Sequence, residues 1–268
     1  MLRDITLGQY YSSDSLIHRL DPRVKIIAAV LFIVELFLVK SFVGFAVCAG
    51  ALAVTVAISG VPLKFILRGL KPVILILLFT FFLNMFMVPG TVIWKFGFLQ
   101  VTLEGLELAT FMSIRLILLI IGSSMLTLTT TPLQLTDGLE KLFTPLRIIK
   151  VPTHELAMTM SIALRFIPTL LEETDKIMKA QQARGADFES GNFVNRAKAL
   201  VPVLLPLFIS AFRIAQDLSF AMEARCYRGG IGRTRMHKMK FGKADYGAMV
   251  IIAAFLAVII IGRSLYNL

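Results

Sequence analysis

The sequence predicts an all-α membrane protein with about five transmembrane helices and a cytoplasmic region of long amphipathic coupling helices. Hydrophobic residues make up 57% of the 268 residues and charged residues 17%, a composition typical of membrane proteins. Long apolar runs recur along the chain between short polar segments. Two further segments, residues 153–185 and 197–226, have helical periodicity but are too polar to span a bilayer.

Five apolar segments have roughly the 20 residues that a bilayer span requires, once their flanks are included. They are residues 26–39, 42–59, 72–88, 108–128 and 246–262. Asp21 followed by Pro22 fits the N-cap and first position of the first helix. The segment between the second and third spans is expected to be a loop, and residues 91–107 an interfacial segment that includes Trp94.

The distribution of positive charge predicts the orientation. Four Lys or Arg residues precede the first span, three follow the second, and 17 lie in residues 129–245, whereas the opposite side holds only Lys40, Lys95 and Arg263. By the positive-inside rule, the N-terminus and residues 129–245 are cytoplasmic and the C-terminus is outside. An apolar run at 200–209, interrupted by two prolines, is expected to be too short to span.

The chain accordingly divides into three parts. Residues 1–128 hold the N-terminal segment and the first four spans. Residues 129–245 are the cytoplasmic coupling region, and residues 246–268 hold the last span. Glu35 and Arg115 fall inside spans, and positions that face the bundle or snorkel are favoured over an ion path.

Several function classes are disfavoured. The net charge of +11 could indicate nucleic acid, but the apolar composition makes anionic lipid headgroups and topology the better explanation, so no nucleic acid partner is expected. There is no phosphate-binding loop motif, because Gly242-Lys243 is followed by Ala244, so the chain is not expected to hydrolyse ATP. The three histidines are scattered, which predicts no metal site. Enzyme function is therefore not expected.

The two amphipathic segments end in the same kind of tip, Ala183-Arg184-Gly185 in the first and Ala224-Arg225-Cys226 in the second. A single such arginine would be explained by its favourable interaction with the helix dipole. Two copies on matched helices favour a docking role, in which a planar guanidinium enters a narrow site between small residues. Leu170, Leu171, Phe208 and Phe212 lie on apolar faces and are expected to contact a partner or another helix.

These tips resemble those of the transmembrane T component of energy-coupling factor (ECF) transporters, a branch of the ABC importers. Residues 14–25 and 223–230 are also similar to that family, and Cys-Tyr-Arg-Gly-Gly looks most like the shared T component of Gram-positive bacteria. The resemblance implies a multi-pass protein of the bacterial plasma membrane. It also implies two cytoplasmic ATPases that bind the tips and carry ATP and Mg, and an interchangeable S component that binds a vitamin. No cofactor is expected on this chain.

Two other functions are compatible with the residues alone. A stand-alone secondary transporter would have inverted repeats and a midplane site, whereas the repeat seen here lies in the cytoplasmic region. A membrane adaptor without a transport role is the second. Co-purification with a pair of ATPases separates both from the T component.

Overall fold

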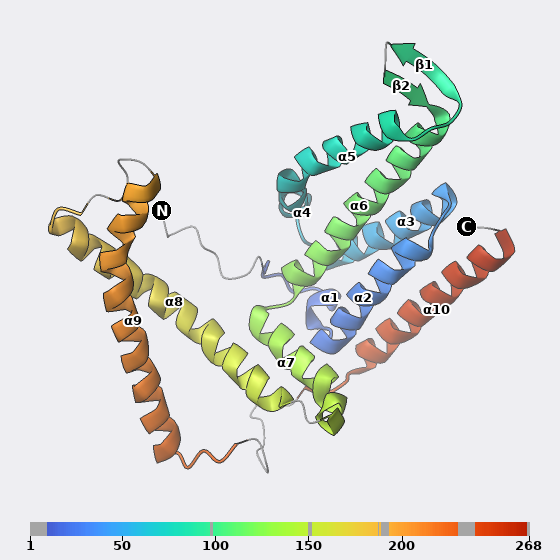
Figure 1. Ribbon diagram of the computed structural model, residues 1–268. Helices are drawn as coiled ribbons and strands as arrows, with labels where there is room; N and C mark the ends of the chain where they lie inside the picture. The colour runs from blue at the N-terminus through green and yellow to red at the C-terminus, as the bar shows by residue number, and fades with distance from the viewer. Residues whose placement is uncertain are drawn as a thin grey trace. The chain divides into compact units, whose positions relative to one another are not determined.

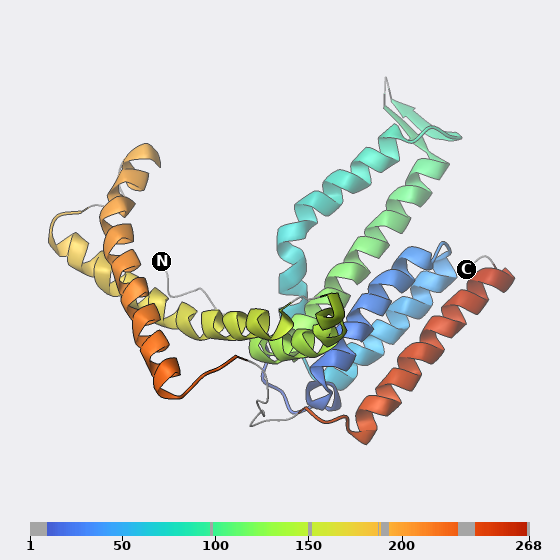
Figure 2. The same ribbon diagram turned by 60° about the horizontal axis from the view of Figure 1, so that its bottom comes forward.

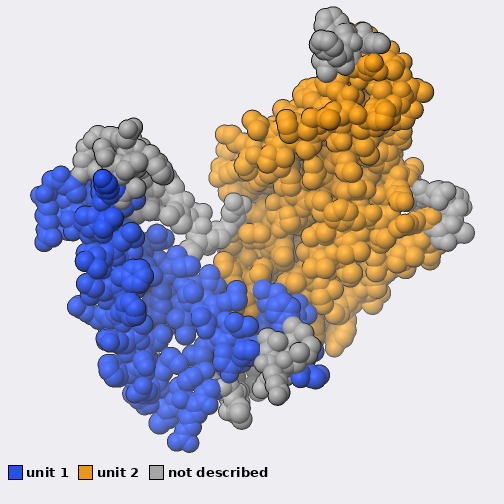
Figure 3. Space-filling view, viewed as in Figure 1, with its two compact units in different colours: residues 1–7, 139–237 blue, residues 8–138, 238–268 orange. Residues whose placement is uncertain are grey.

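The chain folds into two compact units in the computed structural model, which describes residues 10–96, 99–149, 152–186, 188, 193–229 and 239–266 (Figure 1). Unit 1 comprises residues 1–7 and 139–237, and unit 2 comprises residues 8–138 and 238–268 (Figure 3).

Unit 2 is a bundle of helices that run alongside one another, with a small hairpin at one end (Figure 1, Figure 2). In chain order its elements are α1 (Leu16–Arg19), α2 (Pro22–Leu38), α3 (Phe42–Ser59), α4 (Leu63–Leu70), η2 (Lys71–Val73), α5 (Ile74–Met87), β1 (Val92–Phe96), β2 (Leu99–Thr102), α6 (Leu103–Thr129), the first part of α7 (Pro132–Phe143) and α10 (Lys243–Tyr266). Unit 1 holds the end of α7, η3 (Thr144–Ile149), α8 (Thr153–Ala183) and α9 (Phe193–Ala224).

Side-chain caps fix where the helices of unit 2 begin. The Asp21 side chain accepts from the Arg23 backbone N–H and Pro22 stands in the first turn of α2, so the predicted N-cap is confirmed. Ser41 caps α3 and Thr102 caps α6 in the same way. Gly60 ends α3 with a φ of 67°, a left-handed conformation that glycine adopts without steric cost.

The core of unit 2 is apolar and draws side chains from α2, α3, α4, α6 and α10. Its buried members are Leu36, Val39, Phe45, Cys48, Leu52, Val61, Ile66, Leu118, Met125, Leu128 and Ile259. At Gly122 of α6 an added Cβ would lie 2.6 Å from the Phe32 ring of α2, so the absence of a side chain lets the two helices approach closely. The central contacts of the bundle therefore join segments far apart in the sequence.

Five described stretches are long and apolar enough to cross a membrane, which confirms an all-α membrane protein. They are Phe42–Ser59, Leu63–Met87, Leu103–Thr129, Lys198–Ala224 and Lys243–Arg263. The set differs from the predicted one in two places. The predicted first span forms α2, a helix of 17 residues that is not among these stretches. The expectations that the run at 200–209 is too short to span and that segment 197–226 is too polar to span were both wrong. The run lies within α9, which continues through both prolines, and Lys198–Ala224 is long and apolar enough to cross a membrane.

One loop prediction also needs correction. The segment between the second and third spans, expected as a loop, forms α4 and continues through η2 into α5, because its apolar residues recur at helical spacing. The interfacial segment that includes Trp94 forms the antiparallel β1–β2 hairpin. The Glu104 carboxylate secures the chain before this hairpin by accepting from the Thr91 N–H at 2.7 Å.

Arg115 of α6 lies against the bundle rather than in an ion path. Its guanidinium donates to the carbonyls of Leu36 and Val39, both at 3.1 Å, and so satisfies acceptors that the end of α2 leaves free. The same group lies over the rings of Phe37 and Phe45 at 5.5 and 5.6 Å. Arg115 thus fastens α6 to the turn between α2 and α3.

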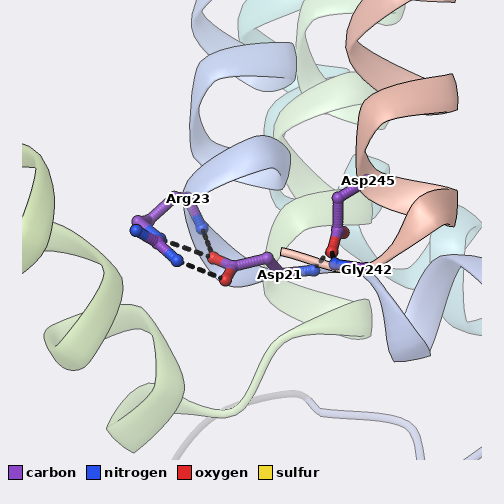
Figure 4. A network of polar contacts seen from close by, with 4 residues as sticks. All are labelled: Asp21, Arg23, Gly242 and Asp245. Carbon is purple, nitrogen blue, oxygen red and sulfur yellow. Dashed lines mark hydrogen bonds and ion pairs between the residues drawn. The ribbon is translucent and has the colours of Figure 1, made fainter. Parts of the chain in front are cut away.

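A polar network joins the beginnings of α2 and α10 (Figure 4). The buried Asp245 carboxylate accepts from the Asp21 N–H at 2.8 Å and from the Gly242 N–H at 2.7 Å. The Asp21 carboxylate binds the Arg23 guanidinium, which stacks 4.0 Å from the Phe241 ring centroid. Burial alone would raise the pKa of Asp21, but hydrogen bonds from the Arg23 side chain and backbone hold this pKa below its usual value. The Asp21 cap therefore stays ionised, and the Asp245 carboxylate joins α10 to α2 through the Asp21 N–H.

Candidate functional site

The candidate site is carried by two long helices of unit 1. α8 has 31 residues and α9 has 32, close to the predicted segments 153–185 and 197–226. α8 contains Pro168, and α9 contains Pro202 and Pro206. Each proline removes one backbone donor, so the carbonyl four residues earlier loses its partner within the helix. These freed carbonyls are available to side chains of a neighbouring helix.

The end of α8 is a Schellman motif with Arg184 at the C-cap. The Gly185 N–H donates to the Gln182 carbonyl at 2.9 Å and the Ala186 N–H donates to the Gln181 carbonyl at 3.0 Å. Gly185 has a φ of 93°, the left-handed conformation that this motif requires. The glycine after the arginine is thus needed to turn the chain at the tip.

The end of α9 has the same geometry around Arg225. The Cys226 N–H donates to the Glu223 carbonyl at 2.8 Å and the Tyr227 N–H donates to the Met222 carbonyl at 3.0 Å. Cys226 takes the left-handed position with a φ of 54°, and it is the single non-glycine residue with positive φ in the part of the chain that the structure describes. Two helices with different sequences therefore present an arginine from the same backbone position.

All six predicted tip residues are exposed, namely Ala183, Arg184, Gly185, Ala224, Arg225 and Cys226. Over the described ranges neither tip guanidinium takes part in an ion pair with this chain. The helix dipole makes a C-terminal end favourable for a cation but consumes none of the hydrogen-bond donors of arginine. The N–H donors of both guanidinium groups are therefore available to an acceptor on another molecule.

Contacts between α8 and α9 place the two tips at opposite ends of the pair (Figure 1). Near the first tip, the Gln181 side-chain amide donates to the Pro202 carbonyl at 3.4 Å. That carbonyl is free because Pro206 has no N–H to offer it. Beyond the second tip, the Tyr227 hydroxyl donates to the Met158 sulfur at 3.0 Å, near the start of α8. At 1.5 Å per residue, the α9 helix from Pro202 to its tip spans roughly 33 Å.

The four predicted packing residues divide into two groups. Leu170 and Leu171 are half-buried on α8. Phe208 and Phe212 are each 64% exposed on α9, with ring centroids 6.0 Å apart. Their face also includes the exposed Leu204, Leu205 and Ile209. An apolar face of this extent is typical of a surface that another protein or lipid covers.

Replacing Gly185 by valine is expected to loosen the first tip. A side chain in the left-handed conformation costs about 1–2 kcal/mol, so hydrogen exchange at the Ala186 amide should accelerate roughly tenfold. Replacing Cys226 by glycine is the matched control, because it keeps the conformation and should preserve protection at the Tyr227 amide. Unchanged exchange at Ala186 in the valine variant would mean that the motif does not depend on the small residue.

The family model described as cobalt transport protein, CbiQ, matches residues 13–238. The chain belongs to this family.

Curated relatives place it more narrowly. Three are named energy-coupling factor transporter transmembrane protein EcfT. The protein of Ruminiclostridium cellulolyticum is 54% identical over 97% of this chain and 98% of its own length. That of Thermosediminibacter oceani is 57% identical over 93% and 94%, and that of Bacillus subtilis is 47% identical over 96% and 98%.

Membership of this family shows what kind of protein the chain is. It is a multi-pass transmembrane component of a transporter of the Gram-positive type, and not a catalytic subunit. Sequence reasoning located both tips but missed what holds them, namely Gln181 against Pro202 and Tyr227 against Met158. The spacing of Pro202 and Pro206 by four residues was the available signal, since the second proline frees the carbonyl of the first.

Proposed function

We propose that this chain is the scaffold and coupling subunit of an ECF importer. Two cytoplasmic ATPases, which carry ATP and Mg, bind the tips at Arg184 and Arg225. Closure of the ATPase pair moves α8 and α9, and these helices pass the motion to a membrane-embedded S component that binds a vitamin. Leu170, Leu171, Phe208 and Phe212 contribute to the apolar surface that meets the S component or packs the helices.

The repeated tip geometry carries the proposal. Both arginines follow a complete helix, both stand at the C-cap of a Schellman motif, and both are exposed. The tips lie at the two ends of one helix pair, which suits two equivalent receivers on two subunits. The two helices, of more than 30 residues each, contact each other near the first tip and are joined again by Tyr227 just beyond the second, which supports the transmission of a displacement between them.

Co-purification tests the proposed assembly. The chain, expressed in a Gram-positive host and solubilised in detergent, is expected to retain two ATPase subunits and a small S component. Recovery of the chain without ATPases, together with a substrate uptake rate that does not depend on ATP, would favour a stand-alone carrier. Retention of partners without uptake in reconstituted vesicles would favour a membrane adaptor.

Lysine at either tip is expected to uncouple hydrolysis from uptake. Arg184→Lys and Arg225→Lys keep the charge but replace a planar fork by a flexible point charge. The loss of one charge-assisted bond should weaken ATPase binding roughly tenfold. Uptake should fall further than binding, because a loose contact slips when the ATPases close. The measurement is substrate transported per ATP hydrolysed in vesicles, and a ratio equal to that of the parent in both variants would exclude a mechanical role.

Cysteine labelling tests the proposed orientation in the bacterial plasma membrane. The proposal places the N-terminus and residues 129–245 in the cytoplasm and the C-terminus outside, because of the 17 positive charges in the coupling region. It therefore takes α9 not to cross the membrane, although Lys198–Ala224 is long and apolar enough to do so. With Cys226 replaced by serine, Ile93→Cys should react with an impermeant thiol reagent on whole cells. Lys179→Cys should react only after the membrane is opened. Reversed labelling would overturn the orientation.

A further inference from the structure

We propose that the exposed basic side of α4 binds the headgroup of an anionic phospholipid. Lys64, Arg68 and Lys71 follow one another at spacings of four and three residues, so they project from one side of the helix. Lys71 continues the helical course, with φ −51° and ψ −48°. All three side chains are exposed. We call these three residues the basic face.

The other sides of α4 fix how the basic face is presented. Ile66 is 3% exposed in the core of unit 2, and the Phe65 ring lies 5.2 Å from that of Tyr11. Gly69 lies so close to α6 that an added Cβ would stand 3.2 Å from the Ser124 hydroxyl oxygen. These contacts anchor one side of the helix to the bundle. The basic face is therefore held in a fixed orientation by its own helix.

An exposed apolar stripe runs beside the basic face. It consists of Leu63, Leu67 and Ile74, which are 65%, 59% and 50% exposed. Apolar and basic sides that adjoin on one helix are typical of a helix at the boundary between acyl chains and headgroups. The stems of Lys64 and Lys71 can cover apolar surface while their ammonium groups reach the headgroups.

The chain offers the basic face no carboxylate nearby in sequence. There is no aspartate or glutamate between Glu35 and Glu104, nor along α6 after Glu107. Asp14 is bound by Arg19 and Asp21 by Arg23. Among the residues that the structure describes, the basic face forms no ion pair, and its one cation–π contact is that of the Arg68 guanidinium with the Phe65 ring, 5.4 Å from the ring centroid. The counter-charge is thus expected from another molecule.

The position of the basic face indicates that a lipid supplies the counter-charge. α4, η2 and α5 form one stretch, Leu63–Met87, long and apolar enough to cross a membrane. The basic face stands at the beginning of this stretch, where a span meets the headgroup layer. A phosphodiester accepts hydrogen bonds from both ammonium and guanidinium groups, and the guanidinium can bind two of its oxygens. Free phosphate shares this chemistry but lacks the acyl chains that the apolar stripe would contact.

Native mass spectrometry of the full complex in detergent tests the proposal. Phosphatidylglycerol and phosphatidylcholine with the same acyl chains are titrated separately. The parent is expected to prefer phosphatidylglycerol, and the triple variant Lys64→Gln, Arg68→Gln, Lys71→Gln should lose most of this preference. Each cation near an anionic lipid is worth about fivefold in binding, so the three together account for up to about 100-fold.

Two further variants separate charge from folding. Lys64→Arg with Lys71→Arg should keep the lipid preference. Lys141→Gln, Lys179→Gln and Lys198→Gln remove three exposed charges from unit 1 and should leave the preference unchanged. The parent's preference persisting in the first triple variant would overturn the proposal. So would its removal by excess inorganic phosphate, which would identify a free-phosphate site. Loss of the ATPases from that variant with unaltered lipid affinity would identify a protein contact instead.

Discussion

Alanine at both tips, Arg184→Ala with Arg225→Ala, is expected to release the ATPases from the solubilised complex. Truncating one partner of a buried charge pair at an interface typically costs about 2–5 kcal/mol. The two contacts also assist each other, because the second forms within a complex already held by the first. Each single variant should therefore weaken retention, and the double variant should abolish it in pull-down experiments.

Arg165→Ala with Arg213→Ala is the matched control for this experiment. Both arginines are exposed on the bodies of α8 and α9, so the variant loses the same charge from the same helices. It should retain the ATPases. A double tip variant that still recovers a stoichiometric pair of ATPases would exclude the docking role, and equal loss in the control would reduce that role to net charge.

Removal of the Asp245 carboxylate is expected to destabilise unit 2 more than any other change in its polar network. Asp245→Ala leaves the Asp21 and Gly242 N–H groups without their acceptor. The Asp21 N–H is buried and costs about 1–3 kcal/mol when left without a partner, whereas the partly buried Gly242 N–H can bond water, so the total should reach about 1–3 kcal/mol. The measurement is thermal unfolding of the purified protein in detergent.

Asp14→Ala supplies the comparison within the same unit. Asp14 pairs with Arg19 on the surface, where both side chains are mostly exposed. Such pairs contribute little to stability because water screens them. This variant should unfold at nearly the parent temperature. Equal decreases of the unfolding temperature in the two variants would show that the burial of Asp245 does not increase its contribution to stability.

Helix positions were largely predictable from periodicity and capping residues. The predicted segment 153–185 corresponds to α8 at Thr153–Ala183, and Asp21 with Pro22 begins α2 as expected. The errors arose where local rules compete with the rest of the helix. Two prolines argued against a membrane span at 200–209, yet 32 residues of helix tolerate the loss of single hydrogen bonds. α4 was predicted as a loop because its basic residues make the segment too polar for a membrane span.

The candidate site was predictable in composition but not in geometry. The repeated Ala-Arg-small pattern identified both tips, and their role in binding ATPases stays a prediction. The left-handed conformation of Gly185 could be inferred from glycine after a helix, but that of Cys226 could not, since few side chains adopt it. Contacts such as Tyr227 with Met158 join residues 69 positions apart, and no local pattern encodes such a pairing.

Pro206 links the residue at one position of α9 to the residue at one position of α8. Any other amino acid at this position would bring an N–H group, which would bond the Pro202 carbonyl within α9. The amide of Gln181 would then share its acceptor with the helix, and selection for an amide at that position would relax. The two positions are therefore expected to co-vary during evolution, with proline at 206 inherited together with a hydrogen-bond donor at 181. Lineages that lost one would be free to replace the other.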